Sequence, residues 1–451
     1  MAKSRTQFVC QKCGASYPKW TGKCDNCGEW NSLVEQAPTS AGNSAVARSE
    51  SRGRKLPVQT MNSIVIESKF DRMSSGVSDL DDVLGGGILP GGVMLLAGQP
   101  GIGKSTLLLQ IAAHVSRGEP VLYVSGEESA HQVKLRATRL GADSHDSLSF
   151  VSSTSADDIA ATIKTGEYKL VIVDSIQTLS LEEISSAPGT VSQITNSSNV
   201  VIRAAKSAGT ALVLVGHVTK EGSIAGPKVL EHLVDVVLQF EGDRYGGFKM
   251  VRAVKNRYGS TSEVAIFEMN ERGLELVKNP SAALLAERQS ADGSVVLATM
   301  EGTRPLLVEI QALVNPTNFG YPKRTASGFD LNRLNLLVAV LERRTKLTLS
   351  DKDIYINVVG GMKLLDPAAD LAICMAIASA AAERQLDEQT VVFGEVGLGG
   401  EVRSAQHATQ RIAEAKKLGF NHALAPKASK DTTKFIQQVG TLRQALIDYL
   451  T

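Results

Sequence analysis

The sequence predicts an α/β protein in which helices cover a central parallel β-sheet, with a small cysteine-rich domain before it and a further domain after it. Three observations carry this prediction. Short apolar runs recur between residues 93 and 240 at the spacing of alternating strands and helices. A glycine-rich turn joins the first of these runs to a helical pattern. Four of the five cysteines fall within the first 27 residues, and the apolar pattern changes near residue 280.

Composition narrows the class of protein. A chain of 451 residues exceeds one typical core, so two or three domains are expected. The formal net charge of +1 means that any site for a polyanion would be a local patch. No apolar run approaches the roughly 20 residues of a membrane span, and the N-terminus lacks the apolar core of a signal peptide. We therefore expect a cytoplasmic protein without membrane contact.

The first domain, residues 1–34, contains two CxxC pairs separated by ten residues. Each pair lets one short turn present two thiolates to a tetrahedral ion, and two turns close the shell, which predicts structural Zn²⁺. Chance pairs or a redox dithiol are the alternatives. The predicted ligands are Cys10, Cys13, Cys24 and Cys27. Residues 35–60 are rich in Ser, Ala, Gly and Arg without periodicity, and they are predicted to form a flexible linker.

The phosphate-binding motif G-x-x-x-x-G-K-[ST] follows the apolar run 93–97 and precedes an apolar-periodic helix. Its glycines let backbone N–H groups wrap phosphates, and the helix N-terminus adds partial positive charge. Lys104 is predicted to reach the β- and γ-phosphates of ATP, and Ser105 to ligate Mg²⁺. The nucleotide-binding residues predicted are Gly98, Gln99, Pro100, Gly101, Ile102, Gly103, Lys104, Ser105 and Thr106.

Further strands are predicted at residues 121–125, 170–174, 211–216 and 234–240. Asp174 ends the second of these, where a carboxylate that helps to hold Mg²⁺ belongs in P-loop proteins. Glu127 and Glu128 follow the first, and either could be the base that activates water; the sequence does not separate them, and Glu127 is taken as the candidate. A charge pair stabilised at a helix N-terminus is the alternative for these two. His217 is a candidate sensor of the γ-phosphate, or a histidine that is merely hydrogen-bonded.

The order of these motifs resembles a known family. The four-cysteine knuckle, GQPGIGKST, YVSGEES, VIVDSIQ and KNRYG are similar to the bacterial RadA (Sms) family of RecA-type ATPases, over essentially the whole chain. The family motif is usually written KNRFG, and Tyr258 keeps the ring, so little change is expected. The resemblance implies a RecA-like ATPase domain at residues 61–279. It also implies a DNA-dependent ATPase that forms a homo-oligomeric ring, a hexamer, and acts as a translocase or helicase in homologous recombination and repair, promoting branch migration. The implied partners are single-stranded DNA, branched recombination intermediates and the recombinase RecA.

The cations of KNRYG sit beyond the last strand that nucleotide binding needs. In RecA-type motors a neighbouring subunit commonly supplies cations to the γ-phosphate. Lys255 and Arg257 alternate along a strand end, so they are predicted to act on a neighbour's site. Alternation equally suits a solvated edge strand.

Two loops are expected to face the channel of such a ring. One spans residues 182–199, and the other spans 219–235 and carries Lys220 and Lys228. Backbone amides and lysines there would contact phosphates without reading sequence. Neither loop is aromatic, which argues against strong base stacking. Ordinary mobile loops are the alternative.

Residues 280–451 resemble the proteolytic domain of the Lon family, which is an α+β fold. The stretch LLDPAADLA places Ala368 at the position of the nucleophilic serine, and the lysine position falls near Thr409. An alanine cannot attack a carbonyl, so we expect no proteolysis. Basic residues of this domain are predicted to bind DNA, although a solvated helix face explains them equally: Arg333, Arg343 and Arg344. An ATP-gated scaffold without motor activity and an ATP-dependent protease remain as alternative functions.

Overall fold

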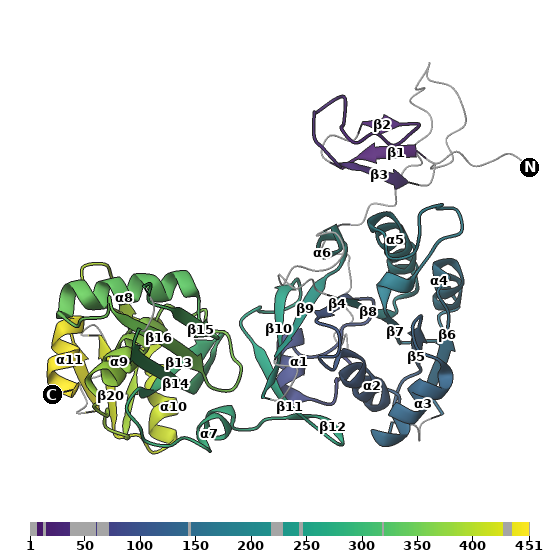
Figure 1. Ribbon diagram of the computed structural model, residues 1–451. Helices are drawn as coiled ribbons and strands as arrows, with labels where there is room; N and C mark the ends of the chain where they lie inside the picture. The colour runs from purple at the N-terminus through teal and green to yellow at the C-terminus, as the bar shows by residue number, and fades with distance from the viewer. Residues whose placement is uncertain are drawn as a thin grey trace, which may run out of the picture. The chain divides into compact units, whose positions relative to one another are not determined.

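The structure, a computed structural model, describes residues 7–11, 15–36, 60, 72–142, 146–217, 229–242, 247–317, 320–426 and 435–450 (Figure 1). The chain divides into two compact units. The first comprises Met1–Phe240, Ala253–Thr261 and Glu271–Gly273, and the second comprises Glu241–Arg252, Ser262–Asn270 and Leu274–Thr451. Within the described ranges, no helix is long and apolar enough to cross a membrane. Of the predicted linker 35–60, only residues 35, 36 and 60 lie inside these ranges.

The N-terminal residues form a three-stranded antiparallel sheet of order β2-β1-β3. The strands are β1 (Gln7–Cys10), β2 (Ser16–Tyr17) and β3 (Leu33–Gln36). Its buried core consists of Cys10, Cys24 and Leu33, with a few half-buried neighbours. A core this small buries too little apolar area to stabilise a fold, and such domains generally depend on a metal or disulfides.

A nine-stranded sheet of order β12-β11-β10-β9-β4-β8-β7-β5-β6 follows. All ladders from β9 to β6 are parallel, and the inner strands β4, β5 and β8 are almost wholly buried, as expected for a sheet covered on both faces. The strands are β4 (Val93–Gly98), β5 (Val121–Ser125), β6 (Leu148–Ser152), β7 (Leu170–Asp174), β8 (Ala211–His217), β9 (Val236–Gly242), β10 (Lys249–Asn256), β11 (Val264–Asn270) and β12 (Gly273–Leu276). The helices of this part are α1 (Ser78–Leu84), α2 (Lys104–Val115), α3 (Ala130–Arg139), α4 (Ala156–Lys164), α5 (Val191–Ala208) and α6 (Val229–Leu233).

The predicted parallel α/β fold is confirmed, with several differences from the prediction. The predicted loop 219–235 is wrong in its described part, which begins with helix α6 (Val229–Leu233). Strand β6 was not predicted, because its sequence LSFVS is half-exposed at the sheet edge and shows no apolar run. The predicted loop 182–199 is wrong in its second half, since α5 begins at Val191. The Thr190 hydroxyl caps that helix by accepting from the Gln193 N–H. The Gln193 side chain is buried and bonds the backbone of Leu181, so small polar residues here serve a helix.

The second unit is built on a seven-stranded mixed sheet of order β15-β16-β14-β13-β17-β20-β21. The antiparallel hairpin of β13 (Ser294–Glu301) and β14 (Arg304–Pro316) forms its centre. Helix α9 (Ala369–Ala382) is buried along most of its length, which explains its run of alanines and other apolar residues. The remaining elements are α7 (Pro280–Leu285), β15 (Arg324–Ser327), α8 (Leu331–Thr345), β16 (Lys352–Val358), β17 (Thr390–Val392), β18 (Glu395–Val396), β19 (Val402–Arg403), α10 (Ala408–Lys417), β20 (His422–Pro426), β21 (Ile436–Val439) and α11 (Leu442–Leu450).

Candidate active site

The glycine-rich loop connects the buried strand β4 to helix α2. Gly98 ends the strand so close to its neighbour that an added Cβ would lie 2.7 Å from the Phe240 carbonyl oxygen. Gly103 precedes the helix with a φ of 118°, a conformation that side-chain-bearing residues rarely adopt. The first N–H groups of α2 have no partner within the helix, so they are free to bind an anion. The predicted phosphate loop is therefore present as a strand–turn–helix.

Lys104 lies across this loop. Its Nζ donates to the carbonyl oxygens of Gly98 at 2.9 Å and Gln99 at 3.0 Å, and it lies 3.1 Å from Nδ1 of His217. Only 5% of the residue is exposed. Burial lowers the pKa of Lys104 to about 8, although the charges of Asp174 and Glu127 oppose the shift. The ammonium is thus close to losing its proton at a mildly alkaline pH.

His217 connects this lysine to an acid. Its Nδ1 faces the Lys104 ammonium, which can only donate, so Nδ1 accepts and the ring proton of the neutral form lies on Nε2. Nε2 lies 3.8 Å from Oε1 of Glu127. Burial and the neighbouring charge of Lys104 lower the pKa of His217, which keeps the ring neutral. The three side chains form a chain of contacts, Lys104–His217–Glu127, which joins the start of α2, the end of β8 and the turn after β5.

The two predicted carboxylates lie at the ends of paired strands, since Ser125 is in register with Asp174. Asp174 Oδ2 accepts from the Tyr123 hydroxyl at 2.8 Å. Burial raises the pKa of Tyr123 well above its usual range, so this hydroxyl remains a donor. Glu127 Oε1 accepts from the Ser175 hydroxyl at 2.7 Å, so the acid is anchored beside Asp174.

Glu128 differs from Glu127 in its partners. Both of its carboxylate oxygens accept from the Arg136 guanidinium, at 2.8 and 2.5 Å. A bidentate pair with an arginine occupies both oxygens of a carboxylate and fixes its direction. Glu127 keeps 47% of its side chain exposed and faces His217, so the geometry separates two neighbours that the sequence left equivalent.

The KNRYG motif is organised around a buried acid, Asp235. Its side chain is 4% exposed and lies 3.4 Å from Nη1 of Arg257 and 3.3 Å from Nζ of Lys206. The Tyr258 hydroxyl also bonds Asp235, and burial together with this carboxylate raises the pKa of Tyr258 to about 12. The hydroxyl that distinguishes KNRYG from KNRFG therefore has a structural partner, which the sequence did not reveal. Asp235 Oδ2 in turn accepts from the Val93 N–H at 3.1 Å.

The two cations of the motif have different surroundings. Lys255 donates to the carbonyl oxygens of Glu231 and Val234, at 2.5 and 2.7 Å, near the end of the short helix α6. Burial and the charge of Arg257 lower the pKa of Lys255. The Arg257 side chain is 55% exposed. Of the pair, Arg257 is the cation that is available to a group outside the chain.

The motif lies near the amino end of strand β4, whereas the phosphate loop follows its carboxyl end. Asp235, which holds Arg257, bonds the first residue of β4, and the phosphate loop begins at the last residue, Gly98. Five residue steps separate Val93 from Gly98, or about 17 Å along a strand. This exceeds the length of an arginine side chain, so Arg257 does not reach the phosphate loop of its own chain.

Three cysteines cluster in the N-terminal domain. The Sγ atoms of Cys10, Cys24 and Cys27 lie within 4.8 Å of one another, with Cys10 and Cys27 at 3.6 Å. Zn–S bonds of about 2.3 Å in a tetrahedron place sulfur atoms slightly less than 4 Å apart, so this donor set fits zinc. Cys13, the fourth predicted ligand, lies outside the described residues.

Comparison with known proteins agrees with this geometry. Residues 62–223 match the family described as AAA domain, residues 8–35 the family described as Rubredoxin metal binding domain, and residues 336–429 the family described as Subunit ChlI of Mg-chelatase. The chain is 49% identical to the DNA repair protein RadA of Bacillus subtilis (strain 168), over 99% of this chain and 98% of that protein. It is 47% identical to the DNA repair protein RadA of Brucella abortus (strain 2308), over 96% and 94% of the two chains. The chain belongs to the RadA family. It is thus an ATPase of this family with an N-terminal zinc ribbon and a Lon-like C-terminal domain.

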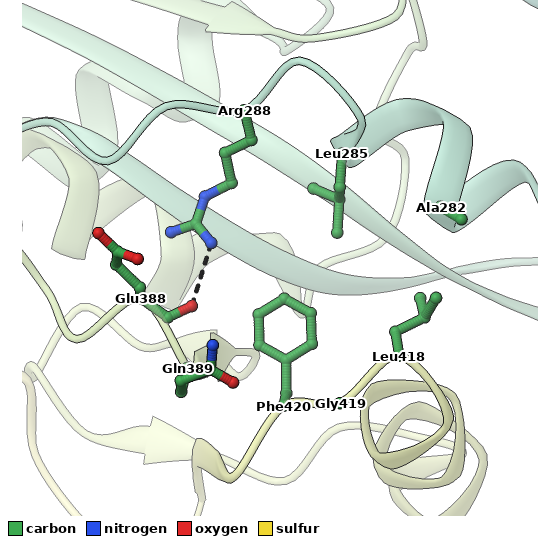
Figure 2. Close-up of a pocket in the computed structure, with 8 residues that line it drawn as sticks. All are labelled: Ala282, Leu285, Arg288, Glu388, Gln389, Leu418, Gly419 and Phe420. Atoms are coloured by element: carbon green, nitrogen blue, oxygen red, sulfur yellow. Dashed lines mark hydrogen bonds between the residues drawn. The ribbon is translucent and has the colours of Figure 1, made fainter.

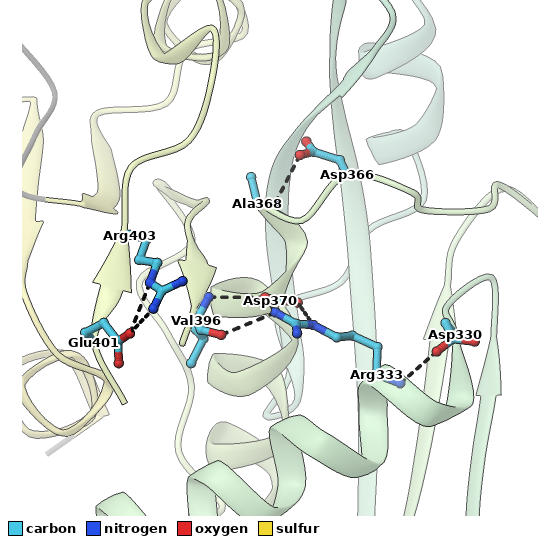
Figure 3. Close-up of polar contacts among 8 residues, drawn as sticks. All are labelled: Asp330, Arg333, Asp366, Ala368, Asp370, Val396, Glu401 and Arg403. Atoms are coloured by element: carbon cyan, nitrogen blue, oxygen red, sulfur yellow. Dashed lines mark hydrogen bonds and ion pairs between the residues drawn. The ribbon is translucent and has the colours of Figure 1, made fainter. Parts of the chain in front are cut away.

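The residues predicted to bind DNA in this RadA family member differ in their exposure and in their partners within the chain. Lys220 and Lys228 lie outside the described residues. Arg343 is exposed near the end of α8, and Arg344 is exposed with its Nε donating to the Leu398 carbonyl at 3.3 Å. Arg333 is bound within its own domain, because its guanidinium bonds both carboxylate oxygens of the buried Asp370 (Figure 3). That partner favours a structural role for Arg333.

The Lon-like domain carries a methyl group where a Lon protease has its serine. Ala368 is the N-cap of α9 and is 2% exposed; its N–H donates to Asp366 (Figure 3). Thr409, at the lysine position, is exposed on α10. A cavity of about 460 Å³ lies beside Ala368 and Asp366. A second cavity, of about 350 Å³, is lined by Leu285, Phe420 and Arg288, which donates to the Glu388 carbonyl (Figure 2).

Proposed function

We propose that this chain is a DNA-dependent ATPase that assembles into a ring and translocates on DNA during homologous recombination and repair, promoting branch migration in the cytoplasm. The observation that carries the proposal is the position of Arg257, near the amino end of β4 and remote from the phosphate loop at the other end of that strand. A subunit with an exposed cation there is suited to complete the ATP site of a neighbour. In a hexameric ring, every ATP site receives an arginine from the neighbouring subunit. Such a motor translocates on single-stranded DNA or on branched intermediates, together with the recombinase RecA.

Within one ATP site, the proposed roles follow the contacts. MgATP supplies the phosphoryl group that is transferred to water. Lys104 binds the β- and γ-phosphates by exchanging the carbonyls of Gly98 and Gln99 for phosphate oxygens, with the N–H groups of residues 98–106 around them. Ser105 and Asp174 would hold Mg²⁺, and the bond from the Tyr123 hydroxyl to the Asp174 carboxylate supports this role.

Glu127 is the proposed general base. Its carboxylate is anchored by Ser175 and has no arginine partner among the described residues, unlike Glu128. His217 lies between Glu127 and Lys104 and is suited to report the γ-phosphate to the base, because a phosphate that draws Lys104 away changes the hydrogen bond at Nδ1. These side chains assist catalysis by positioning the reacting groups and by stabilising charge, which is what phosphoryl transfer requires.

In the neighbour's site, Arg257 stabilises the charge that develops on the transferred phosphoryl group. Lys255 supports the same turn through its bonds to Glu231 and Val234, and contributes positive charge to that edge.

DNA is the polymer on which the proposed motor translocates. Lys220, Lys228, Arg343 and Arg344 are the proposed phosphate contacts, and Arg333 contributes less because Asp370 holds it. We propose the domain limits 1–34, 35–60, 61–279 and 280–451, with Cys13 completing the zinc site of the first domain. With Ala368 at the serine position, the last domain works without proteolysis.

One experiment separates the motor from the ATP-gated scaffold. ATP turnover is measured with and without single-stranded DNA, and displacement of an annealed strand is followed in the same reactions. A motor shows DNA-stimulated turnover together with strand displacement, and Lys104→Ala abolishes both. Stimulated turnover without displacement on any forked or branched substrate would favour the scaffold.

A further inference from the structure

The chain has two tryptophans, Trp20 and Trp30, and both are exposed on the zinc ribbon, by 55% and 70%. Large aromatic side chains dominate the apolar area that proteins bury, so leaving both in water has an energetic cost. No other large hydrophobic side chain is exposed in the ribbon among the residues described. The proposed function assigns them no role.

The two rings belong to one surface. An ideal Cβ at Gly22 would lie 3.7 Å from Cζ3 of Trp30 and 3.8 Å from Cη2 of Trp20, so both rings meet over this glycine. The Gly22 carbonyl accepts from the Asn31 N–H at 2.8 Å, and Lys23 is bridged to Trp30, which ties the two tryptophan segments together. The backbone pairing between these two segments, and not burial against other side chains, holds the two rings next to each other.

Cations accompany the rings. Lys19 precedes Trp20 and is exposed, and the Lys23 ammonium lies 5.7 Å from the centre of the Trp30 ring. Asp25 and Glu29 are exposed in the same domain, so the local charge is close to balanced. Attraction for a polyanion is therefore weak here, and the rings supply the greater part of any affinity.

We propose that Trp20 and Trp30 form a stacking platform for the bases of single-stranded DNA, with Lys19 and Lys23 against the adjoining phosphates. Every base has a π-face, so aromatic platforms bind single strands without reading sequence. Two rings without a third exposed large hydrophobic side chain in the described part of the ribbon make a patch smaller than the apolar core of a protein interface, which favours stacking on single bases. The inference rests on the proposed function for its ligand, and it supplies the aromatic contact that the predicted channel loops lack.

The intrinsic fluorescence of the full-length, zinc-loaded protein reports this surface alone, because the chain has no other tryptophan. Titration with oligothymidylate should quench the emission. Trp20→Ala and Trp30→Ala should each weaken binding about fivefold or more, while the slope of log affinity against log salt stays unchanged. Basal ATP turnover and zinc content should match the parent protein, which shows that the variants fold.

Tyr321→Ala is the matched control. Tyr321 is 89% exposed in the second unit, so its loss removes an exposed ring without touching the platform, and affinity should stay at the parent value. Trp30→Phe should recover part of the affinity that Trp30→Ala loses, because a smaller ring still stacks.

The failures are distinguishable. If single-stranded DNA stimulates ATP turnover but leaves the fluorescence unchanged, and both alanine variants bind as tightly as the parent, the platform is refuted while the motor stands. If DNA neither binds nor stimulates turnover, the motor and the platform both fail. Emission that ignores DNA but shifts to the blue when RecA is added would assign the rings to a protein interface and overturn the inference.

Discussion

Replacing Arg257 by alanine should cripple ATP hydrolysis while leaving the subunit folded and able to bind ATP. Arginines that act across subunits contribute about 10³-fold or more to turnover in related systems, or roughly 4 kcal/mol of transition-state stabilisation. ATP binding should change little, because the phosphate loop lies about 17 Å along β4 from the Asp235 that holds this arginine.

The effect on stability should be small for reasons visible in the structure. The Arg257 side chain is 55% exposed, and its contact with Asp235 is 3.4 Å long. The guanidinium end of this pair lies mostly in water, which screens its charge, so its loss should cost little, on the order of 1 kcal/mol. After the change, Asp235 still has the Val93 N–H and Lys206 as partners. The free energy of unfolding should therefore fall far less than the activation barrier rises.

Lys206→Ala is the matched control, since it removes the other cation of the same carboxylate at a similar distance and exposure. If Arg257 merely neutralised Asp235, the two variants would lose activity alike. Under the proposed role, Lys206→Ala keeps most of its turnover. Arg257→Lys should recover little, because a point charge does not reproduce the guanidinium fork.

Mixing two inactive proteins then tests the role across subunits. In a ring of Arg257→Ala and Lys104→Ala subunits, some interfaces join an intact phosphate loop to an intact arginine, and these should hydrolyse ATP. Recovery should be greatest at equal amounts. Rings that demonstrably exchange subunits and yet show no recovery at any ratio would refute the reasoning.

Four further outcomes are expected. Glu127→Gln should lower turnover by at least about 10²-fold with ATP binding retained, whereas Glu128→Gln, which loses only its pair with Arg136, should lower it far less; equal losses in rapid-quench assays would contradict the assignment of the base. Native protein should carry one zinc per chain and Cys27→Ser should release it; metal analysis that finds no zinc in the native protein would exclude the site. Burial lowers the pKa of Lys104 to about 8, so above that pH the free enzyme loses the proton that phosphate binding needs. The Kd for ATP should then rise with pH and binding should take up a proton, which calorimetry in two buffers detects; an affinity that stays constant from about pH 7 to pH 9.5 would be inconsistent with it. DNA affinity should fall steeply between about 50 and 200 mM salt, and a flat response would argue against phosphate contacts.

Local patterns predicted most of the sheet but not its edges. Strands such as β4 and β7 are continuous apolar runs, which only a buried parallel sheet requires, so their limits were predicted almost to the residue. Edge strand β6 is half-exposed and leaves no such pattern. Helix α5 begins within polar residues, because its buried face at that end uses Ser192 and Gln193, whose hydrogen bonds a sequence does not show.

The candidate site shows the same division between local and distant contacts. Spacing alone placed Lys104 on its loop and Asp174 at a strand end. Spacing did not separate Glu127 from Glu128, because only Glu128 pairs with Arg136, which lies eight residues later, within α3. Nor did it reveal Asp235 beneath the KNRYG turn, since that pairing joins segments more than twenty residues apart and depends on burial.

The bond between Asp235 and the first N–H of β4 has a mechanical consequence. The phosphate loop follows the carboxyl end of this strand. The amino end is hydrogen-bonded to Asp235, which pairs with Arg257. The strand is paired on both sides, with β8 and β9, which makes it one of the stiffer elements of the sheet. In the proposed ring, a small shift of the phosphate loop when ATP binds or leaves would be transmitted along β4 to Arg257, the residue proposed to act on the next subunit. Such a strand would couple the nucleotide bound at one site to the position of the arginine at the next site. This coupling would set the order in which the sites of a ring hydrolyse ATP.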